Sequence, residues 1–95
     1  MLHIVNKSPT ASAALHECLK ICGRDDALLL IEDGVYAATG ASAELILAAT
    51  PQVHVLREDL EARGLTDRID TRIAIVDYNG FVQLSGAHNP IQSWY

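Results

Sequence analysis

One run of five apolar residues, Ala27-Leu28-Leu29-Leu30-Ile31, constrains the fold more than any other feature of this chain. The run does not alternate between apolar and polar residues, as a strand with one face in water would. Glu32-Asp33-Gly34 ends it abruptly. Strands that are covered on both faces have this pattern, and they belong to parallel sheets with helices on each side. The run therefore predicts the central strand of an α/β domain.

The rest of the chain alternates between short apolar runs and segments with helical patterns. Further strands are expected at residues 2–5, 53–56 and 73–76, and helices at 9–22, in two pieces within 35–49, at 57–63 and after Asp77. We expect Phe81, Leu84 and Tyr78 of the last helix to point inward. The tail 91–95 either docks as a fifth strand or is covered by a partner. This alternation predicts an α/β fold: a single three-layer domain spanning residues 1–95, with a mostly parallel sheet of four to five short strands and helices on both faces.

The first helix is expected to start at Ser8 and to carry one of the two cysteines on its apolar face. Ser8 can cap free backbone N–H groups, and Pro9 suits a first turn. Apolar positions then recur at helical spacing and form one stripe: Ala11, Ala14, Leu15, Cys18, Leu19 and Cys22. Gly23 is expected to end the helix. Cys18 therefore lies in the middle of a stripe that faces the core.

Composition and charge exclude several classes of function. With 7 basic and 12 acidic residues, the chain has a net charge of −5, which argues against direct binding to nucleic acid. No apolar run approaches the roughly 20 residues that span a bilayer. The first residues lack the basic leader and long apolar stretch of a secretory signal. Two cysteines in such a chain suggest free thiols in a reducing compartment, so we expect a cytoplasmic protein.

Most motifs with a known mechanism are absent from the sequence. The glycines are too scattered for a phosphate-binding loop, and there is no CxxC pair. His16 and Cys18 lie about 200° apart around a helix, so they are poorly placed to bind one metal ion with Cys22. No nucleophile–base pair can be drawn. We therefore expect no metal and no cofactor, and an independent enzyme is disfavoured.

Two interpretations of Cys18 remain open on the residues alone. In the first, the thiol is a small buried hydrophobe in the helix stripe, as free cysteines often are. In the second, Cys18 carries sulfur as a persulfide, which requires an accessible thiolate with a lowered pKa. No cation of this chain is placed to activate it, since Lys20 points about 200° away. A partner subunit would have to help.

The acidic pair Glu32-Asp33 also has two interpretations. It follows the most buried strand, at the end where open α/β sheets place their ligands, so it could orient a proton or a basic group of a partner. Alternatively, Asp33 caps the next helix and Glu32 is solvated. The second interpretation is favoured.

Five blocks of sequence resemble one family in order and register. The opening Leu2-His3-Ile4-Val5-Asn6-Lys7-Ser8-Pro9 is similar to the "LHxxNKSP" start of the TusB/DsrH family. Similar blocks follow at residues 27–38, 56–65 and 76–84, and the chain closes on Gln92-Ser93-Trp94-Tyr95, which is similar to the family's "QxW" plus terminal residue. The resemblance covers essentially the whole chain.

The resemblance implies a DsrEFH-like fold and a role in sulfur transfer. Members of the family are small cytoplasmic subunits of a sulfur-relay complex, in which a dimer of heterotrimers contains two homologous sister subunits, TusC/DsrF-like and TusD/DsrE-like. The complex passes persulfide sulfur to an acceptor protein, TusE/DsrC-like, for 2-thiolation of the tRNA wobble uridine or, in the DsrH setting, during dissimilatory sulfur oxidation. The dedicated sulfur-bearing cysteine belongs to the TusD/DsrE partner.

The resemblance also assigns expectations to single residues. Cys18 stands where DsrH-type members carry a second cysteine, which makes it a candidate secondary persulfide site. Trp94 and Tyr95 are candidates for the subunit interface, because large amphipathic side chains are favoured there. We expect the chain to act within the complex without contacting RNA or a membrane. The alternative is a purely structural subunit with no sulfur-carrying residue of its own.

Overall fold

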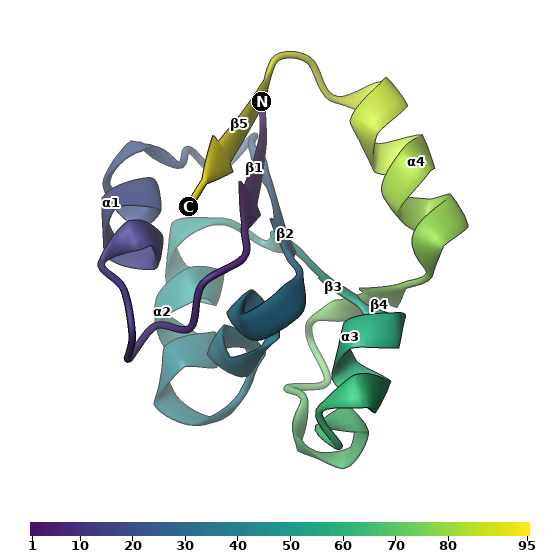
Figure 1. Cartoon of the computed structure of the whole chain (residues 1–95). Helices are drawn as coiled ribbons and strands as arrows, with labels where there is room; N and C mark the ends of the chain where they lie inside the picture. The colour runs from purple at the N-terminus through teal and green to yellow at the C-terminus, as the bar shows by residue number, and fades with distance from the viewer.

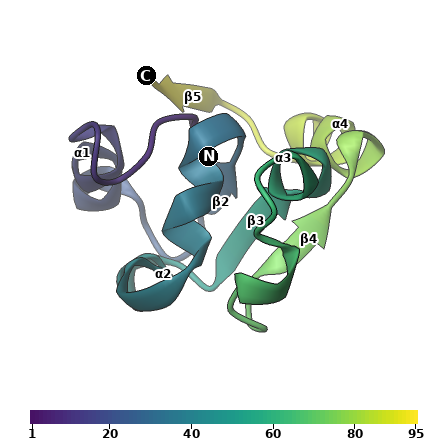
Figure 2. The ribbon, with the colours of Figure 1, turned by 60° about the horizontal axis from the view of Figure 1, so that its bottom comes forward.

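A computed structural model describes all of residues 1–95 and contains one five-stranded sheet. The strand order is β4-β3-β2-β1-β5, and every pairing is parallel. Figure 2 shows β4 and β5 toward opposite ends of the sheet. The elements in chain order are β1 (Leu2–Val5), α1 (Ala14–Ile21), β2 (Ala27–Leu30), the 3-10 helix η1 (Glu32–Ala38), α2 (Gly40–Ala49), β3 (Gln52–Leu56), α3 (Arg57–Ala62), the 3-10 helix η2 (Thr66–Arg68), β4 (Ala74–Val76), α4 (Tyr78–Ala87) and β5 (Ile91–Trp94).

The strand order determines which face of the sheet each helix covers. From β1 to β4 the chain steps across the sheet in one direction, and right-handed crossovers then place α1, η1, α2 and α3 on the same face. The connection from β4 to β5 runs back across the whole sheet, so α4 lies on the opposite face. Figure 1 shows α4 across the sheet from α1 and α2. We call the two sides the α1 face and the α4 face.

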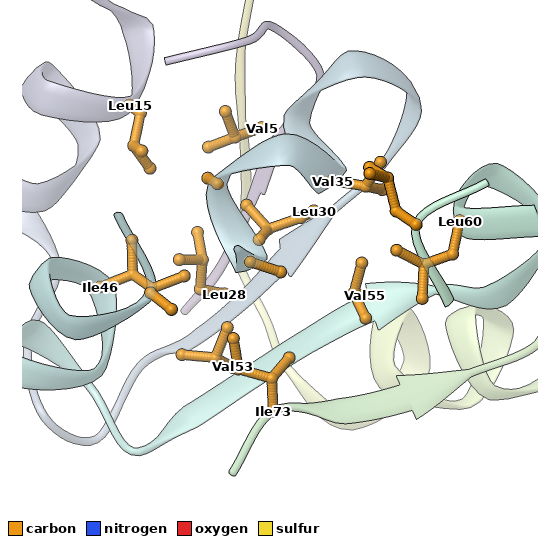
Figure 3. Close-up of a cluster of buried hydrophobic side chains, with 14 of the residues drawn as sticks. Val5, Leu15, Leu28, Leu30, Val35, Ile46, Val53, Val55, Leu60 and Ile73 are labelled. Atoms are coloured by element: carbon orange, nitrogen blue, oxygen red, sulfur yellow. The ribbon is translucent and has the colours of Figure 1, made fainter. Parts of the chain in front are cut away.

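The main core fills the α1 face, and Figure 3 shows it. It comprises 15 buried residues from three strands, α1, η1, α2, α3 and the segments after α3. Alternate residues of β2, Leu28 and Leu30, point into it, together with Val53 and Val55 of β3. Aliphatic side chains dominate the cluster, as the low aromatic content of 5% requires.

The α4 face holds a much smaller core. Its buried members are Leu2, Ile4, Ala27 and Leu29, and Phe81 and Leu84 of α4 pack against them. Leu28 and Leu29 are both fully buried on opposite faces of one strand, which explains the absence of alternation in the sequence. The predicted fold class is confirmed: a parallel sheet with helices on both faces.

The C-terminal part of the chain agrees with the sequence predictions in most respects. Asp77 caps α4, and its side chain accepts a hydrogen bond of 2.8 Å from the Gly80 N–H. The tail forms a fifth strand, β5, which pairs with β1. Tyr78, predicted to point inward, is instead 65% exposed, because only Phe81 and Leu84 face the sheet. None of the helices is long and apolar enough to cross a membrane.

The predicted start of the first helix is wrong by about five residues. The Ser8 carbonyl accepts hydrogen bonds from the N–H groups of Ala11 and Ser12, which forms a turn, and α1 begins only at Ala14. The Ser8 hydroxyl accepts from the Thr10 N–H within this turn and caps no helix. Turns and helix starts use the same residue types, so the sequence did not separate them.

Candidate functional site

Cys18, the candidate secondary persulfide site, lies inside the main core. It is the fifth residue of α1 and is fully buried, beside the buried Leu15 of the same helix. Because α1 begins at Ala14, Cys18 lies closer to the helix start than the sequence predicted. It still lies beyond the first turn, and the helix dipole acts only within that turn. This placement is the one that the packing interpretation requires.

The surroundings of Cys18 oppose ionisation of its thiol. Burial raises its pKa to about 12, and the negative charge of Asp26, together with that of Cys22 once Cys22 ionises, adds to the effect. At pH 7 the thiol then exceeds the thiolate by roughly 10⁵ to one, and only the thiolate is an effective nucleophile. In the isolated chain, Cys18 is therefore poorly suited to accept sulfur.

A partly buried polar network surrounds His3 beside the C-terminal end of α1. The fully buried His3 ring lies with its Nε2 atom 3.0 Å from Oδ2 of Asp26. Trp94 of β5 donates its Nε1–H to His3 Nδ1 over 3.1 Å. Asp26 also accepts hydrogen bonds from the Gly23 N–H and from the amino group of Met1. The network connects the first strand, the loop after α1 and the last strand.

The Trp94 bond determines which nitrogen of His3 carries the proton. An indole N–H only donates, so Nδ1 of His3 must be the acceptor and the ring proton lies on Nε2. His3 then donates to the Asp26 carboxylate. The hydrogen bond from the Gly23 N–H, the bond from His3 and the charge of the amino terminus hold the pKa of Asp26 well below its usual range.

Cys22 stands next to this network and raises the question of a metal site. Its Sγ, the His3 ring and the Asp26 carboxylate bring their ligand atoms within 4.8 Å of one another. However, a metal ion on His3 Nε2 would require the ring proton to move to Nδ1, where it would face the Trp94 N–H. The arrangement does not fit a metal ion while that hydrogen bond exists. The triplet that the sequence analysis considered and set aside was a different one, and in the structure its His16 is exposed whereas its Cys18 is buried.

The two aromatic residues predicted for an interface differ in their surroundings. Trp94 is half-buried, packs against the main core and uses its only polar atom within the chain. Tyr95 is 75% exposed and follows β5 at the edge of the sheet. Tyr95 is therefore the more available of the two for a partner.

An open pocket lies near the start of α2 and was not predicted. It has a volume of about 380 Å³, and five of its six lining residues carry hydroxyl groups: Ser8, Thr10, Tyr36, Thr39 and Ser42, with Pro9 as the sixth. Its lining includes no acid, base or thiol. The residues come from three segments of the chain, so their meeting could not be derived from spacing. The pocket offers hydrogen bonds without a catalytic group.

The acidic pair after β2 has a structural role that differs in detail from the prediction. Glu32 is exposed, as expected, but Asp33 caps no helix. Asp33 instead accepts a hydrogen bond of 2.9 Å from Arg63 Nε at the end of α3. The close packing of η1 on β1 requires a glycine at position 34, because a Cβ atom there would overlap the Val5 carbonyl. Asp33 therefore helps to hold η1 against the end of α3.

Comparison with known proteins places the chain in one family. The family model described as DsrH like protein matches residues 7–91. Relatives named Protein TusB are 41% identical over 96 residues in Serratia proteamaculans (strain 568) and 42% identical over 96 residues in Pectobacterium parmentieri. A Protein TusB of Escherichia coli O81 (strain ED1a) is 42% identical over 98 residues. Each comparison covers 99% of this chain and 100% of the relative.

A solved structure supports the fold independently. The crystal structure of the ychN protein from E. coli superposes with a TM-score of 0.78 over 98% of this chain and 97% of that chain, at 18% sequence identity. This chain is a small parallel α/β protein of the DsrEFH-like fold. It belongs to the DsrH/TusB family of sulfur-relay subunits, as the resemblance of its five sequence blocks indicated.

Proposed function

We propose that this chain is a subunit of a cytoplasmic, heteromeric sulfur-relay complex that passes persulfide sulfur toward 2-thiolation of the tRNA wobble uridine. The observation that carries the proposal is the match over the full length to proteins named TusB. The chain would assemble with TusC/DsrF-like and TusD/DsrE-like sister subunits in a dimer of heterotrimers. A TusE/DsrC-like protein would accept the sulfur, and this subunit would not contact RNA.

The chemistry of the described residues supports an accessory role. Cys18 is buried and its thiol has a raised pKa, and the open pocket contains neither a thiol nor a base that would activate its hydroxyl groups. A subunit of this kind would act by holding the sulfur-carrying sister subunit in a productive arrangement.

Co-expression tests assembly and transfer together. The chain should co-purify with both sister subunits, and the complex should transfer sulfur from a persulfide donor to the acceptor protein faster than the sister subunits alone. A strain lacking this chain should lose 2-thiouridine from its tRNA, measured by nucleoside mass spectrometry. Recovery of the chain as a lone monomer beside its sisters would contradict the proposal. Unchanged 2-thiouridine with impaired sulfur oxidation would favour the dissimilatory route.

Cys18 would take part in the relay only if a partner displaces α1. In that case, its thiolate would attack the outer sulfur of a donor persulfide, form a new S–S bond and release the donor thiolate. Mass spectrometry of the assembled complex should then show one added sulfur atom on Cys18, and a Cys22→Ser variant serves as the matched control. If Cys18→Ala transfers sulfur at the wild-type rate, the alternative of a purely structural subunit holds.

A further inference from the structure

Helix α4 presents an exposed face that the chain itself does not cover. None of the ten residues of α4 is buried, although α4 is the helix that covers the α4 face of the sheet. Tyr78 is 65% exposed and Val82 is 58% exposed, one helical turn apart. Figure 1 shows α4 standing at the outside of the molecule, away from α1 and α2. A helix with large apolar groups on its outer side is typical of a protein interface.

The segment that contains α4 also has no Lys, Arg, Asp or Glu side chain. None of the chain's 7 basic and 12 acidic residues lies between Tyr78 and Tyr95, although charged residues make up 20% of the sequence. Interface cores are depleted of charged side chains and enriched in aromatic ones. Ile91 of β5, in the same segment of the chain, is 44% exposed and pairs with Leu2 on the α4 face of the sheet.

Two glycines in α4 differ in what the chain requires of them. A Cβ atom at Gly80 would lie 2.8 Å from Cβ of Val76, so packing inside the chain requires a glycine there. A Cβ atom at Gly86 would meet nothing within 4 Å, and Gly86 is not in a left-handed conformation. Nothing within the chain requires a glycine at position 86, and the open space beside it allows close approach from outside.

The outer side of α4 decreases in size along its length, from Tyr78 through Val82 to Gly86. These residues are four apart and form one ridge of the helix surface. A second helix with the same ridge, running in the opposite direction, would place its tyrosine over Gly86 and its valine against Val82. We propose that α4 packs antiparallel against α4 of a second copy of this chain, around a two-fold axis near Val82.

Two features of the surface favour a second copy as the occupant. Because the ridge is uncharged, its own image brings no like charges together, whereas the rest of the chain carries the net charge of −5. In addition, Tyr78 is held in place by Phe81, with ring centroids 5.8 Å apart. An anchored side chain loses less conformational entropy on binding. The inference does not depend on the proposed sulfur role.

Cysteine cross-linking tests the two-fold axis directly. In a Cys22→Ser background, Val82→Cys should form a disulfide with itself and give a covalent dimer of this chain under mild oxidation. Leu45→Cys on α2, at a site that is 57% exposed, is the matched control and should stay monomeric. The experiment uses the chain alone at high concentration and the complex with its sister subunits. The proposal is overturned if Val82→Cys self-links no more than Leu45→Cys in both preparations, or if it links to a sister subunit.

A second variant tests the small end of the ridge. Gly86→Leu fills a position that is open in the single chain, so α4 should remain folded. The leucine would occupy the space over residue 86 that Tyr78 of the second copy needs. Cross-linking at residue 82 should then be lost, and Ala48→Leu on α2 should leave it unchanged. Retained cross-linking in Gly86→Leu would contradict the packing described above. A complex that assembles and transfers sulfur without self-linking at residue 82 would remove this inference and leave the proposed function intact.

Discussion

The two faces of the sheet are built from the same strands but differ in how they are covered. On the α1 face, three helices and η1 bury a cluster of 15 residues. On the α4 face, one helix packs over four buried residues. The polar groups differ in the same way. His3 on the α1 face has a hydrogen-bond partner at each nitrogen, whereas Nδ1 of His54 on the α4 face is buried without one.

The two faces therefore have different roles, the first in the stability of the fold and the second in contact with other molecules. Buried apolar area is the main favourable contribution to folding, so most of the stability of this small chain should come from the α1 face. The α4 face contributes less, and its outer side remains free for contact with another molecule. Each of the following experiments changes one face and uses the other as its reference.

The largest difference is expected between two adjacent leucines of β2. Leu28→Ala should lower the free energy of unfolding by about 3–5 kcal/mol, because the tightly enclosed cavity on the α1 face cannot collapse. Leu29→Ala should cost about 2–3 kcal/mol, because α4 can move toward the sheet. Both side chains are fully buried, so the pair is matched in chemistry and exposure. Urea unfolding measures both values, and equal losses would show that the two faces are equally rigid.

Asp26 tests the polar network on the α1 face. Asp26→Asn should lower the free energy of unfolding by about 2–3 kcal/mol at pH 7, because charge-assisted hydrogen bonds from His3 and Gly23 are weakened. Asp25→Asn, at an exposed neighbouring residue, is the control and should change little. Thermal unfolding would detect the difference. A loss as small as that of the control would mean that water replaces the network without cost.

The same carboxylate predicts how stability changes in acid. Its pKa is lowered in the folded state, so the unfolded chain takes up the proton first as the pH falls. The contribution of Asp26 is therefore complete above about pH 5 and is lost progressively as the pH falls below the unfolded pKa of about 4. The wild-type and Asp26→Asn stability curves should converge in this range.

The fold could be predicted from the sequence because its signals are local and agree with one another. The run at residues 27–31 identified a strand that is buried on both faces, and Asp77 marked the start of a helix that the structure contains. The predicted start of α1 was wrong because the residue types near Ser8 are as favourable in a turn as at the start of a helix. The pattern also did not show that Tyr78 points outward, because the face of a helix depends on what it packs against.

The surroundings of the candidate site could be predicted only in part. The helical stripe placed Cys18 toward the core, and its burial agrees with the packing interpretation. The network of His3, Asp26 and Trp94 could not be found, because hydrogen-bonded residues that are 23 and 91 positions apart leave no pattern in a single sequence. Only the register of β5 beside β1 brings Trp94 to His3.

Trp94 tests how strongly β5 is fixed to the α1 face. Trp94→Phe keeps an aromatic ring but removes the Nε1–H, which leaves His3 Nδ1 buried without a donor and should cost about 1–2 kcal/mol. Nitrogen chemical shifts of His3 should show the proton on Nε2 in the wild type and a mixture of tautomers in the variant. Tyr95→Phe is the control, since Tyr95 makes no such bond. If the proton stays on Nε2 in Trp94→Phe, the hydrogen bond to Asp26 alone determines the tautomer of His3.

His54 provides the corresponding test on the α4 face. Burial, with a contribution from His88, lowers its pKa, so protonation favours the unfolded chain. Its effect on stability is therefore absent at high pH and becomes unfavourable as the pH falls through the unfolded value of about 6.5. His54→Leu should remove this loss, with a gain of up to about 1 kcal/mol at pH 5.5 relative to pH 7.5. His16→Leu, at an exposed position, should leave the loss of stability at low pH unchanged. If both variants show the same pH dependence of stability, His54 is not its source.

The smallest effects, and the sharpest contrast within one element, are expected at the two glycines of α4. Gly86→Ala should raise the free energy of unfolding of the single chain by about 0.5–1 kcal/mol, because the added methyl group meets open space and alanine favours the helix. Gly80→Ala should lower it, because the new Cβ would lie 2.8 Å from Cβ of Val76. Chemical denaturation at low protein concentration measures both values without contribution from association. If Gly86→Ala is destabilising under these conditions, the glycine is required within the chain itself, and its value to a neighbouring helix would no longer explain why it is there.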